Sequence, residues 1–208
     1  MLTVALTGGI ASGKSIVAEV LRRRGCHVDK SDDVARGIMA PGRPAWEKIV
    51  ARFGPAVLKS DRTIDRRKLG SIVFADAAAR RFLDALVHPL VMEKKRETIA
   101  RLDREGKVKI FVSEAALTLE AGFADFFDKI VVAYCPEEIQ VQRLTGRDGL
   151  GREEALRIIR AQMPAAEKLE YADYVVDTSG SIDETIAQAE ELYEQLLLDA
   201  RIKSASAG

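Results

Sequence analysis

The sequence predicts an α/β fold of the doubly wound class, in which helices cover both faces of a parallel sheet. Short apolar runs alternate with long segments of helical periodicity, a pattern typical of strands that are buried on both faces. A glycine-rich turn directly follows the first apolar run, at the place where a strand would be followed by a helix. The chain has 208 residues, of which 47% are hydrophobic, so it can bury one sizeable core.

The expected strands are four clear apolar runs and one weaker run. The first spans Leu2 to Leu6, and the stretch from about Lys14 to Arg24 then repeats apolar residues at helical spacing. The other clear runs are Val108–Val112, Ile130–Tyr134 and Tyr174–Val176, and the weaker one is Cys26–Asp29. Because helical patterns lie between these runs, a parallel sheet is favoured.

The runs are unevenly spaced, which indicates further parts beside the core. About residues 33–106 form a segment longer than a simple crossover needs, and we interpret it as an inserted helical substrate-binding region. Its helices are predicted to break at Pro41-Gly42, Gly54-Pro55 and Ser60-Asp61. A basic helical segment at about 141–165 is typical of a mobile lid. The core would comprise residues 1–32, 107–140 and 172–200, and we expect 201–208 to form a disordered tail.

The glycine-rich turn fits the pattern G-x-x-x-x-G-K-[ST] of a phosphate-binding loop. The matching residues are Gly8-Gly9-Ile10-Ala11-Ser12-Gly13-Lys14-Ser15. Glycines allow successive N–H groups to form an anion nest, and the following helix adds its positive end. Lys14 is expected to reach the β- and γ-phosphates of ATP, and Ser15 to hold Mg²⁺ through its hydroxyl. A simple glycine turn with an exposed lysine is the alternative, but the position between strand and helix favours nucleotide binding.

Three classes of phosphate-loop protein can be compared with this sequence. The chain contains no asparagine, so it lacks the Asn-Lys-x-Asp element that usually selects guanine in GTPase switches. A motor ATPase usually has an apolar strand that ends in an acid, and Ile110–Glu114 is compatible with that class and with a kinase. The helical insertion and the arginine-rich segment favour a small-molecule kinase, because the acceptor needs its own pocket and the transferred group needs cations and exclusion of water.

A kinase of this kind benefits from a carboxylate that takes the proton of the acceptor hydroxyl and helps to place the metal. Asp32 is the candidate, because it follows the second predicted strand at the edge of the sheet where ligands gather. The alternative is that Ser31 or Asp32 caps a helix that begins near Asp33, and on local sequence alone this alternative is favoured.

Composition limits the expected partners and location. Lys plus Arg and Asp plus Glu each total 32, so the formal net charge is zero and no general attraction for nucleic acid is expected. No apolar run approaches ~18 residues and the start lacks a signal-peptide pattern, so we expect neither a membrane span nor export. Cys26 and Cys135 lie beside apolar stretches as expected for core residues, which favours the reducing cytoplasm. No obligate protein partner is evident.

Motifs along about residues 1–190 resemble, in order, those of the dephospho-CoA kinase family. They are Ala5–Ser15, Asp32 with Val34-Ala35-Arg36, Ile64-Asp65-Arg66-Arg67-Lys68-Leu69-Gly70, Leu86-Val87-His88-Pro89-Leu90, Glu114–Gly122, Arg143-Leu144 with Arg147-Asp148, Gln162-Met163-Pro164 with Lys168, and Ala172–Asp177 with Ser179-Gly180. The resemblance implies a P-loop kinase core with a helical CoA-binding region and a lid. It also implies transfer of the γ-phosphoryl group of ATP to the ribose 3′-hydroxyl of dephospho-CoA, the last step of coenzyme A synthesis.

The resemblance assigns the catalytic and nucleotide-binding roles to particular residues. Asp32 matches the family's acid at the acceptor hydroxyl, the expected general base, whereas Lys14 is the catalytic residue expected to bind the phosphates. The segment from Gly9 through Ile16 matches the ATP-binding loop. Arg143 and Arg147 match lid arginines expected near ATP, where a guanidinium suits phosphate and can stack on adenine. For Arg152, Arg157 and Arg160 a solvated helix face is the simpler interpretation.

The substrate side is assigned in the same way. Arg66, Arg67 and His88 lie in the insertion that is expected to face the CoA moiety, although His88 could equally cap a helix that Pro89 begins. The other hypotheses are a P-loop kinase acting on a nucleoside, nucleotide or shikimate-like acceptor, and a nucleotide-binding protein without catalysis.

Four positions depart from the family's pattern. Lys30 stands where the family often has the first acid of Asp-x-Asp, and Ile16 stands where Thr is common. Thr178 replaces the family's Asn, and the Pro expected near Ala116 is missing. None of these changes removes Lys14, Ser15 or Asp32.

Overall fold

The structure, a computed structural model, describes residues 1–206 and divides into two compact units. The first unit comprises residues 1–30 and the chain from Leu102 onward. The second comprises Ser31–Arg101. Within residues 1–206, no helix is both long enough and apolar enough to cross a membrane.

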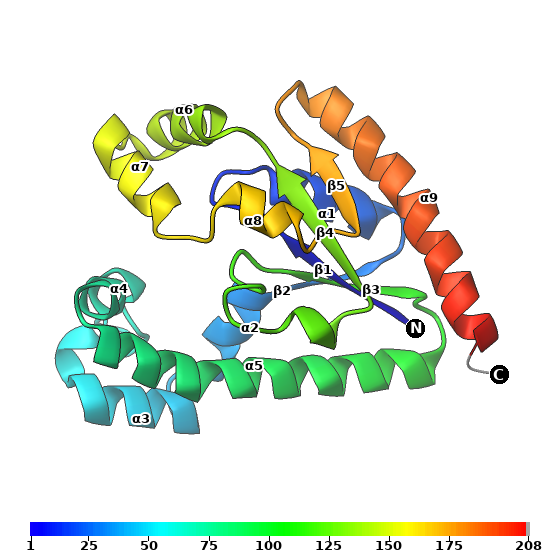
Figure 1. The fold of residues 1–208 in the computed structure, drawn as a ribbon. Helices are drawn as coiled ribbons and strands as arrows, with labels where there is room; N and C mark the ends of the chain where they lie inside the picture. Colours follow the sequence, from blue (N-terminus) through cyan, green and yellow to red (C-terminus); the bar gives the residue numbers. More distant parts are fainter. Residues whose placement is uncertain (207–208) are drawn as a thin grey trace. The chain divides into compact units, whose positions relative to one another are not determined.

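The first unit contains a five-stranded parallel sheet, which confirms the predicted fold class (Figure 1). Its strands are β1 (Leu2–Thr7), β2 (His27–Lys30), β3 (Ile110–Glu114), β4 (Lys129–Tyr134) and β5 (Tyr174–Asp177). All neighbouring pairs are parallel, in the order β2-β3-β1-β4-β5. Because β1 is the central strand, the loop that follows it begins at the carboxyl edge of the sheet, between the ends of β3 and β4.

Helices of the first unit bury the sheet and hold the start of the phosphate loop. They are α1 (Lys14–Arg23), the 3₁₀ helix η2 (Ala124–Phe126), α6 (Glu137–Asp148), α7 (Arg152–Arg160), α8 (Ala165–Leu169) and α9 (Ile182–Ser206). Apolar residues of α1 and α9, among them Leu21 and Leu196, form one core cluster with Val4 and Leu6 of β1. The strand before the loop and the helix after it are therefore fixed by the same buried cluster.

The C-terminal end of the chain differs from the prediction. A disordered tail was expected from residue 201, but α9 continues through Ser206, so the prediction is wrong for residues 201–206, while 207–208 lie outside the described residues. Lys203 donates to both carboxylate oxygens of Asp128, at 2.7 and 2.6 Å, and Asp128 also accepts from the backbone and hydroxyl of Thr3. This long-range contact to the start of β1 stabilises a small polar sequence that has little preference for order of its own.

The second unit is helical. Its elements are α2 (Ser31–Ile38), α3 (Pro44–Phe53), the 3₁₀ helix η1 (Pro55–Val57), α4 (Arg66–Ala75) and most of α5 (Ala77–Glu105). The predicted breaks at Pro41-Gly42 and Ser60-Asp61 fall between these helices, and the break at Gly54-Pro55 falls where α3 ends and η1 begins. Trp46, Ile49 and Val57 belong to its own buried cluster. That this unit binds CoA stays a prediction.

Helix α5 corrects the interpretation of His88 as a cap. Pro89 lies inside this 29-residue helix and does not begin one, so His88 is a mid-helix residue. A proline in a helix interior loses one backbone hydrogen bond, which costs about 3 kcal/mol. The buried side chains of Val87, Val91 and Met92 on both sides of Pro89 supply burial that offsets this cost.

Candidate functional site

The phosphate loop connects β1 to α1, as the sequence predicts. Gly13 precedes α1 in the left-handed conformation, with φ 83°, and Gly8 has φ 145°. A Cβ atom on Gly8 would lie 2.3 Å from the carbonyl oxygen of Ala133, so only glycine fits there. The first turn of α1 contains no acidic residue, so no carboxylate within that turn opposes the positive end of the helix.

Lys14 folds back across the loop that it follows. Its Nζ donates to the carbonyl oxygens of Gly8 and Gly9 at 2.9 and 2.7 Å, and the N–H of Ser12 donates to the same oxygen of Gly9 at 3.2 Å. The ammonium group therefore lies against the loop to which phosphates are expected to bind, as its proposed role requires.

Thr178 lies beneath the loop and is fully buried. Its hydroxyl lies 2.7 Å from the carbonyl oxygen of Ser12 and 3.0 Å from that of Tyr134, and it can donate its single proton to one of them at a time. A Cβ atom on Gly13 would lie 3.1 Å from the Cβ of Thr178, so the two backbones pack closely. Thr178 stands where the family has Asn, and it still links the end of β4 to the loop, because its backbone N–H also donates to the carbonyl oxygen of Tyr134.

Arg143 braces the same region from α6. Its Nη1 donates to the carbonyl oxygen of Ala11 at 3.2 Å and lies 3.4 Å from the Thr178 hydroxyl, and its Nη2 donates to the Thr178 carbonyl oxygen. Ala11 has φ 57°, a left-handed conformation that is uncommon for any residue but glycine. Arg143 therefore supports the loop backbone at its most strained residue, and its contact with ATP stays a prediction.

The two cysteines are free and buried, which confirms their interpretation as core residues. Burial raises the pKa of the Cys26 thiol to about 12. Burial also raises the pKa of Cys135, although the nearby Arg143 guanidinium opposes this effect. Both side chains are therefore neutral thiols at physiological pH, without the thiolate that a nucleophile needs.

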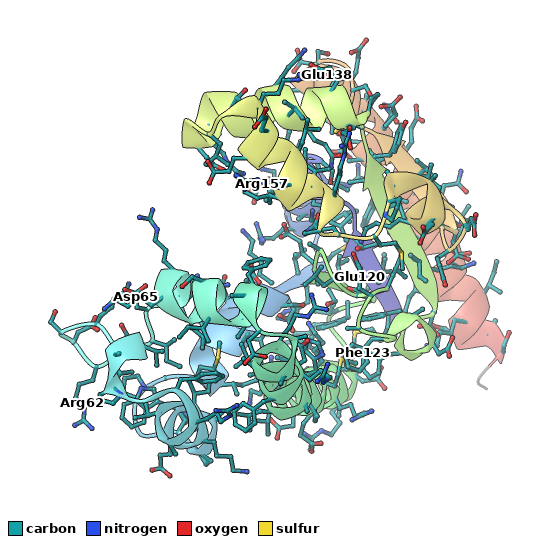
Figure 2. All side chains as sticks on the ribbon, turned by 60° about the vertical axis from the view of Figure 1, so that its left-hand side comes forward. Arg62, Asp65, Glu120, Phe123, Glu138 and Arg157 are labelled. Atoms are coloured by element: carbon teal, nitrogen blue, oxygen red, sulfur yellow. The ribbon has the colours of Figure 1, made fainter. Side chains whose placement is uncertain are left out.

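Helices α6 and α7 pack on the loop and on each other. Ile10 and Ala11 of the loop pack against a cluster formed by Val141, Leu144 and Ala155. Ion pairs join the two helices: Arg152 binds Glu138 through two 2.7 Å bonds, and Arg160 binds Glu137 at 3.0 and 3.2 Å. Figure 2 labels Glu138 on α6 and Arg157 on α7.

The predicted lid arginines therefore differ in what they contact. Arg152 and Arg160 are exposed and bind glutamates of α6, so the solvated-face interpretation describes them well. Arg147 forms a two-bond ion pair with its neighbour Asp148, at 2.8 Å for each bond, and lowers the pKa of that carboxyl group. Arg157 is exposed, and its side chain has no hydrogen-bonding partner within residues 1–206.

Two oxygen atoms near the loop fit a divalent cation. Oε2 of Glu114, at the end of β3, is buried without a hydrogen-bonding partner in the described part of the chain. Glu114 pairs in register with Leu6 of β1, and the exposed Ser15 stands in the first turn of α1. Residues 1–206 contain no cluster of three His, Cys, Asp or Glu side chains that could hold a metal.

In the second unit, Asp32 lies in the first turn of α2, and Nη2 of Arg66 lies 3.8 Å from its Oδ1. Because α2 begins at Ser31, Asp32 is the second residue of the helix and does not precede its start. Its carboxylate is exposed. The structure thus brings together two residues that the sequence analysis selected separately, the acid and one of the basic residues.

A cavity of about 640 Å³ lies within the second unit. It is lined by Arg36, Met39, Ala40, Pro41, Lys59, Thr63, Ile64, Asp65, Arg66 and Arg67. Asp65, labelled in Figure 2, caps α4 by accepting from the N–H groups of Arg67 and Lys68 at 3.0 and 3.2 Å. His88 does not line this cavity, and its Nε2 lies 3.7 Å from Oδ1 of Asp84.

The parallel sheet and the loop after its central strand define a nucleotide-binding protein of the P-loop kinase fold. A shikimate kinase from Acinetobacter baumannii, in complex with shikimate, has this fold with a TM-score of 0.53 over 96% of this chain and 94% of that chain. The two sequences are only 16% identical, so this likeness concerns the fold alone.

The family model for dephospho-CoA kinase matches residues 2–184. A dephospho-CoA kinase from Geobacter metallireducens is 45% identical over 195 residues, which cover 94% of this chain and 96% of that relative. The structure of a dephospho-CoA kinase from Campylobacter jejuni has a TM-score of 0.69 and 30% identity, and covers 93% of this chain and 96% of its own. The chain belongs to the dephospho-CoA kinase family.

The first prediction concerns Thr178. Thr178→Val keeps the shape of the side chain but leaves a buried loop carbonyl without its donor, so we expect a loss of about 1–2 kcal/mol in the free energy of unfolding. We also expect weaker ATP binding, because the loop loses a tie at Ser12. Denaturant unfolding and titration with ATP measure the two effects. Thr178→Ser keeps the hydroxyl and serves as the control; equal losses in both variants would contradict the role of this hydrogen bond.

Proposed function

We propose that the protein transfers the γ-phosphoryl group of ATP to the ribose 3′-hydroxyl of dephospho-CoA. The terminal phosphorus–oxygen bond of ATP breaks and ADP leaves, while a new bond forms between phosphorus and the 3′-oxygen. The hydroxyl proton passes to Asp32. The observation that carries this proposal is the phosphate loop with Lys14 folded across it, in a chain whose family model spans residues 2–184.

On the nucleotide side, the loop from Gly8 to Ile16 would bind the phosphates of ATP, with Lys14 neutralising charge on the transferred group. Arg147 would contribute a second cation after exchanging Asp148 for a phosphate oxygen, and Arg143 would act from beside the loop. These assignments agree with the position of Arg143 against Ala11 and with the surface location of Arg147.

Mg²⁺ would be held by Ser15 and, directly or through water, by Oε2 of Glu114. When bound, this ion supplies positive charge that neutralises the phosphate oxygens during transfer. The buried and unpartnered oxygen of Glu114 supports this assignment, because such an atom costs free energy unless a partner or cation satisfies it. On the sequence, Glu114 ends a strand that is compatible with a motor ATPase or a kinase and begins the Glu114–Gly122 motif, but neither pattern assigns it a metal.

On the acceptor side, Asp32 would act as general base and Arg66 would orient its carboxylate. The cavity of the second unit would take part of dephospho-CoA away from the reacting hydroxyl. Its four basic residues suit the diphosphate of this substrate, and Met39, Pro41 and Ile64 offer apolar surface for the pantetheine arm. His88 would contact dephospho-CoA outside this cavity.

We further propose a cytoplasmic location, in keeping with the intracellular pools of ATP and dephospho-CoA that the reaction needs. The free, buried thiols of Cys26 and Cys135 suit a reducing compartment.

The function is tested by incubating the purified protein with MgATP and dephospho-CoA, measuring ADP release and analysing the acceptor by mass spectrometry. We expect one added phosphoryl group and a product that co-migrates with coenzyme A. A panel of nucleosides, nucleotides and shikimate serves as the comparison. ADP release with one of those acceptors and not with dephospho-CoA would contradict the proposed substrate.

Asp32→Asn is expected to lower kcat by roughly 10²–10⁴-fold, the usual contribution of a general base, while ATP binding is kept. Glu47→Gln makes the same carboxylate-to-amide change at an exposed position of α3 and serves as the matched control. Initial rates at saturating substrates and an ATP titration measure the two properties. Near-normal turnover of Asp32→Asn would remove this residue from the role of base.

Arg67→Met tests the cavity. Because a charged hydrogen bond to phosphate contributes about 1.5–3 kcal/mol, we expect the KM for dephospho-CoA to rise roughly 10- to 100-fold. The KM for ATP should not change. Arg43→Met, at an exposed arginine of the same unit outside the cavity, is the control. An unchanged KM for dephospho-CoA in Arg67→Met would place the substrate elsewhere.

A further inference from the structure

Two glutamines hold the peptide groups on either side of Ile10, within the phosphate loop. The N–H of Ile10 donates to Oε1 of Gln162 at 2.7 Å. The carbonyl oxygen of Ile10 accepts from Nε2 of Gln140 at 2.8 Å. Because a backbone N–H can only donate and a carbonyl can only accept, these contacts determine the orientation of both side-chain amides.

The two glutamines come from different parts of the α6–α7 region, and each is itself held in place. Gln140 lies in α6 and is only 4% exposed. Gln162 follows the last turn of α7, and the next residue, Met163, donates its N–H to Oε1 of Glu120 at 3.1 Å. The same oxygen accepts from Nζ of Lys168, a lysine that is 1% exposed (Figure 2 labels Glu120). Gln162 is therefore next to a residue that is anchored by the ion pair between Glu120 and the buried Lys168.

Gly9 leaves space for the side-chain amide of Gln140. The loop pattern leaves its position open to any residue, yet a Cβ atom on Gly9 would lie 2.3 Å from Nε2 of Gln140. Gln140 is buried, so its amide has little room to move away. A residue with a Cβ atom at position 9 would therefore displace the Gln140 amide from the Ile10 carbonyl oxygen.

We infer that Gln162 is a positioning residue for ATP binding: together with Gln140 it fixes the Ile10 peptide groups and holds the phosphate loop in its binding shape. This inference rests on the proposed assignment of the loop to ATP. Without the two amides, the flexible Gly8-Gly9 segment and the left-handed Ala11 would sample other conformations, and ATP binding would have to order them. Ordering the loop in advance lowers that cost.

The test compares Gln162→Met and Gln162→Asn with Gln142→Met. Methionine keeps the length but lacks the acceptor, and asparagine keeps the amide but is one methylene too short to reach Ile10. Gln142 is an exposed glutamine of α6 and supplies the matched control. Equilibrium titration with ATP, initial rates with both substrates, and the melting temperature are measured for each variant.

We expect both Gln162 variants to bind ATP roughly three- to tenfold more weakly, the effect of one neutral hydrogen bond, with an equal rise in the KM for ATP. The kcat at saturating ATP and the KM for dephospho-CoA should stay within about twofold of wild type. The reason is that Gln162 would affect the affinity for ATP and not the rate of phosphoryl transfer once ATP is bound. Gln142→Met should match wild type in every measurement.

Three outcomes would overturn the inference. Unchanged ATP affinity would show that the Ile10 contact has no effect on binding. Tighter ATP binding would show that the Gln162 carbonyl competes with a phosphate for the Ile10 N–H. A fall in kcat with a rise in both KM values and a lower melting temperature would indicate a general structural role. Failure of wild type to phosphorylate dephospho-CoA would instead refute the proposed function, and the ATP titration would still decide the role of Gln162.

Discussion

The site depends on one constraint, which is that the carbonyl oxygens of the phosphate loop must be turned onto donors and away from an anion. The carbonyls of Gly8 and Gly9 accept from Lys14, and that of Ile10 accepts from Gln140. The carbonyl of Ala11 accepts from Arg143, and that of Ser12 from Thr178. Five consecutive carbonyls thus have donors from α1, α6 and the end of β5. An unpaired carbonyl facing a phosphate would repel it, so these side chains are part of the binding site without needing to contact ATP.

This constraint explains how the chain accommodates its departures from the family pattern. Thr178 offers one hydroxyl proton where Asn offers two, and Arg143 supplements it by donating to the Ala11 and Thr178 carbonyl oxygens. Lys30 replaces an acid at the end of β2, and its partner in register on β3 is Glu114. In the proposed magnesium site, Glu114 would supply the acidic side chain that position 30 lacks.

The strands and the loop could be predicted because local sequence determines them: an apolar run such as Ile130–Tyr134 favours a buried strand, and the glycines permit the turn. Features that depend on distant contacts could not be predicted. The order of residues 201–206 depends on Asp128, which is 75 residues away from Lys203. The continuity of α5 through Pro89 depends on burial that local rules do not include. Gln140 belongs to no motif, and Gln162 stands in the Gln162-Met163-Pro164 motif without any sign of its partner, so only the fold brings the two side chains to Ile10. Glu114 carried a usable signal, an apolar strand that ends in an acid.

The packing of Ile10 and Ala11 limits how the predicted lid can move. These side chains belong to the same apolar cluster as Val141, Leu144 and Ala155, so α6 and α7 share their core with the phosphate loop. An outward movement of both helices would expose this cluster and break the bonds of Gln140, Gln162 and Arg143 to the loop. Such a movement would also release the left-handed Ala11 from its brace. Opening of the helices would break these contacts and disorder the loop that is proposed to bind ATP. Because the coupling between two sites is reciprocal, binding of ATP would in turn favour the closed position of the helices.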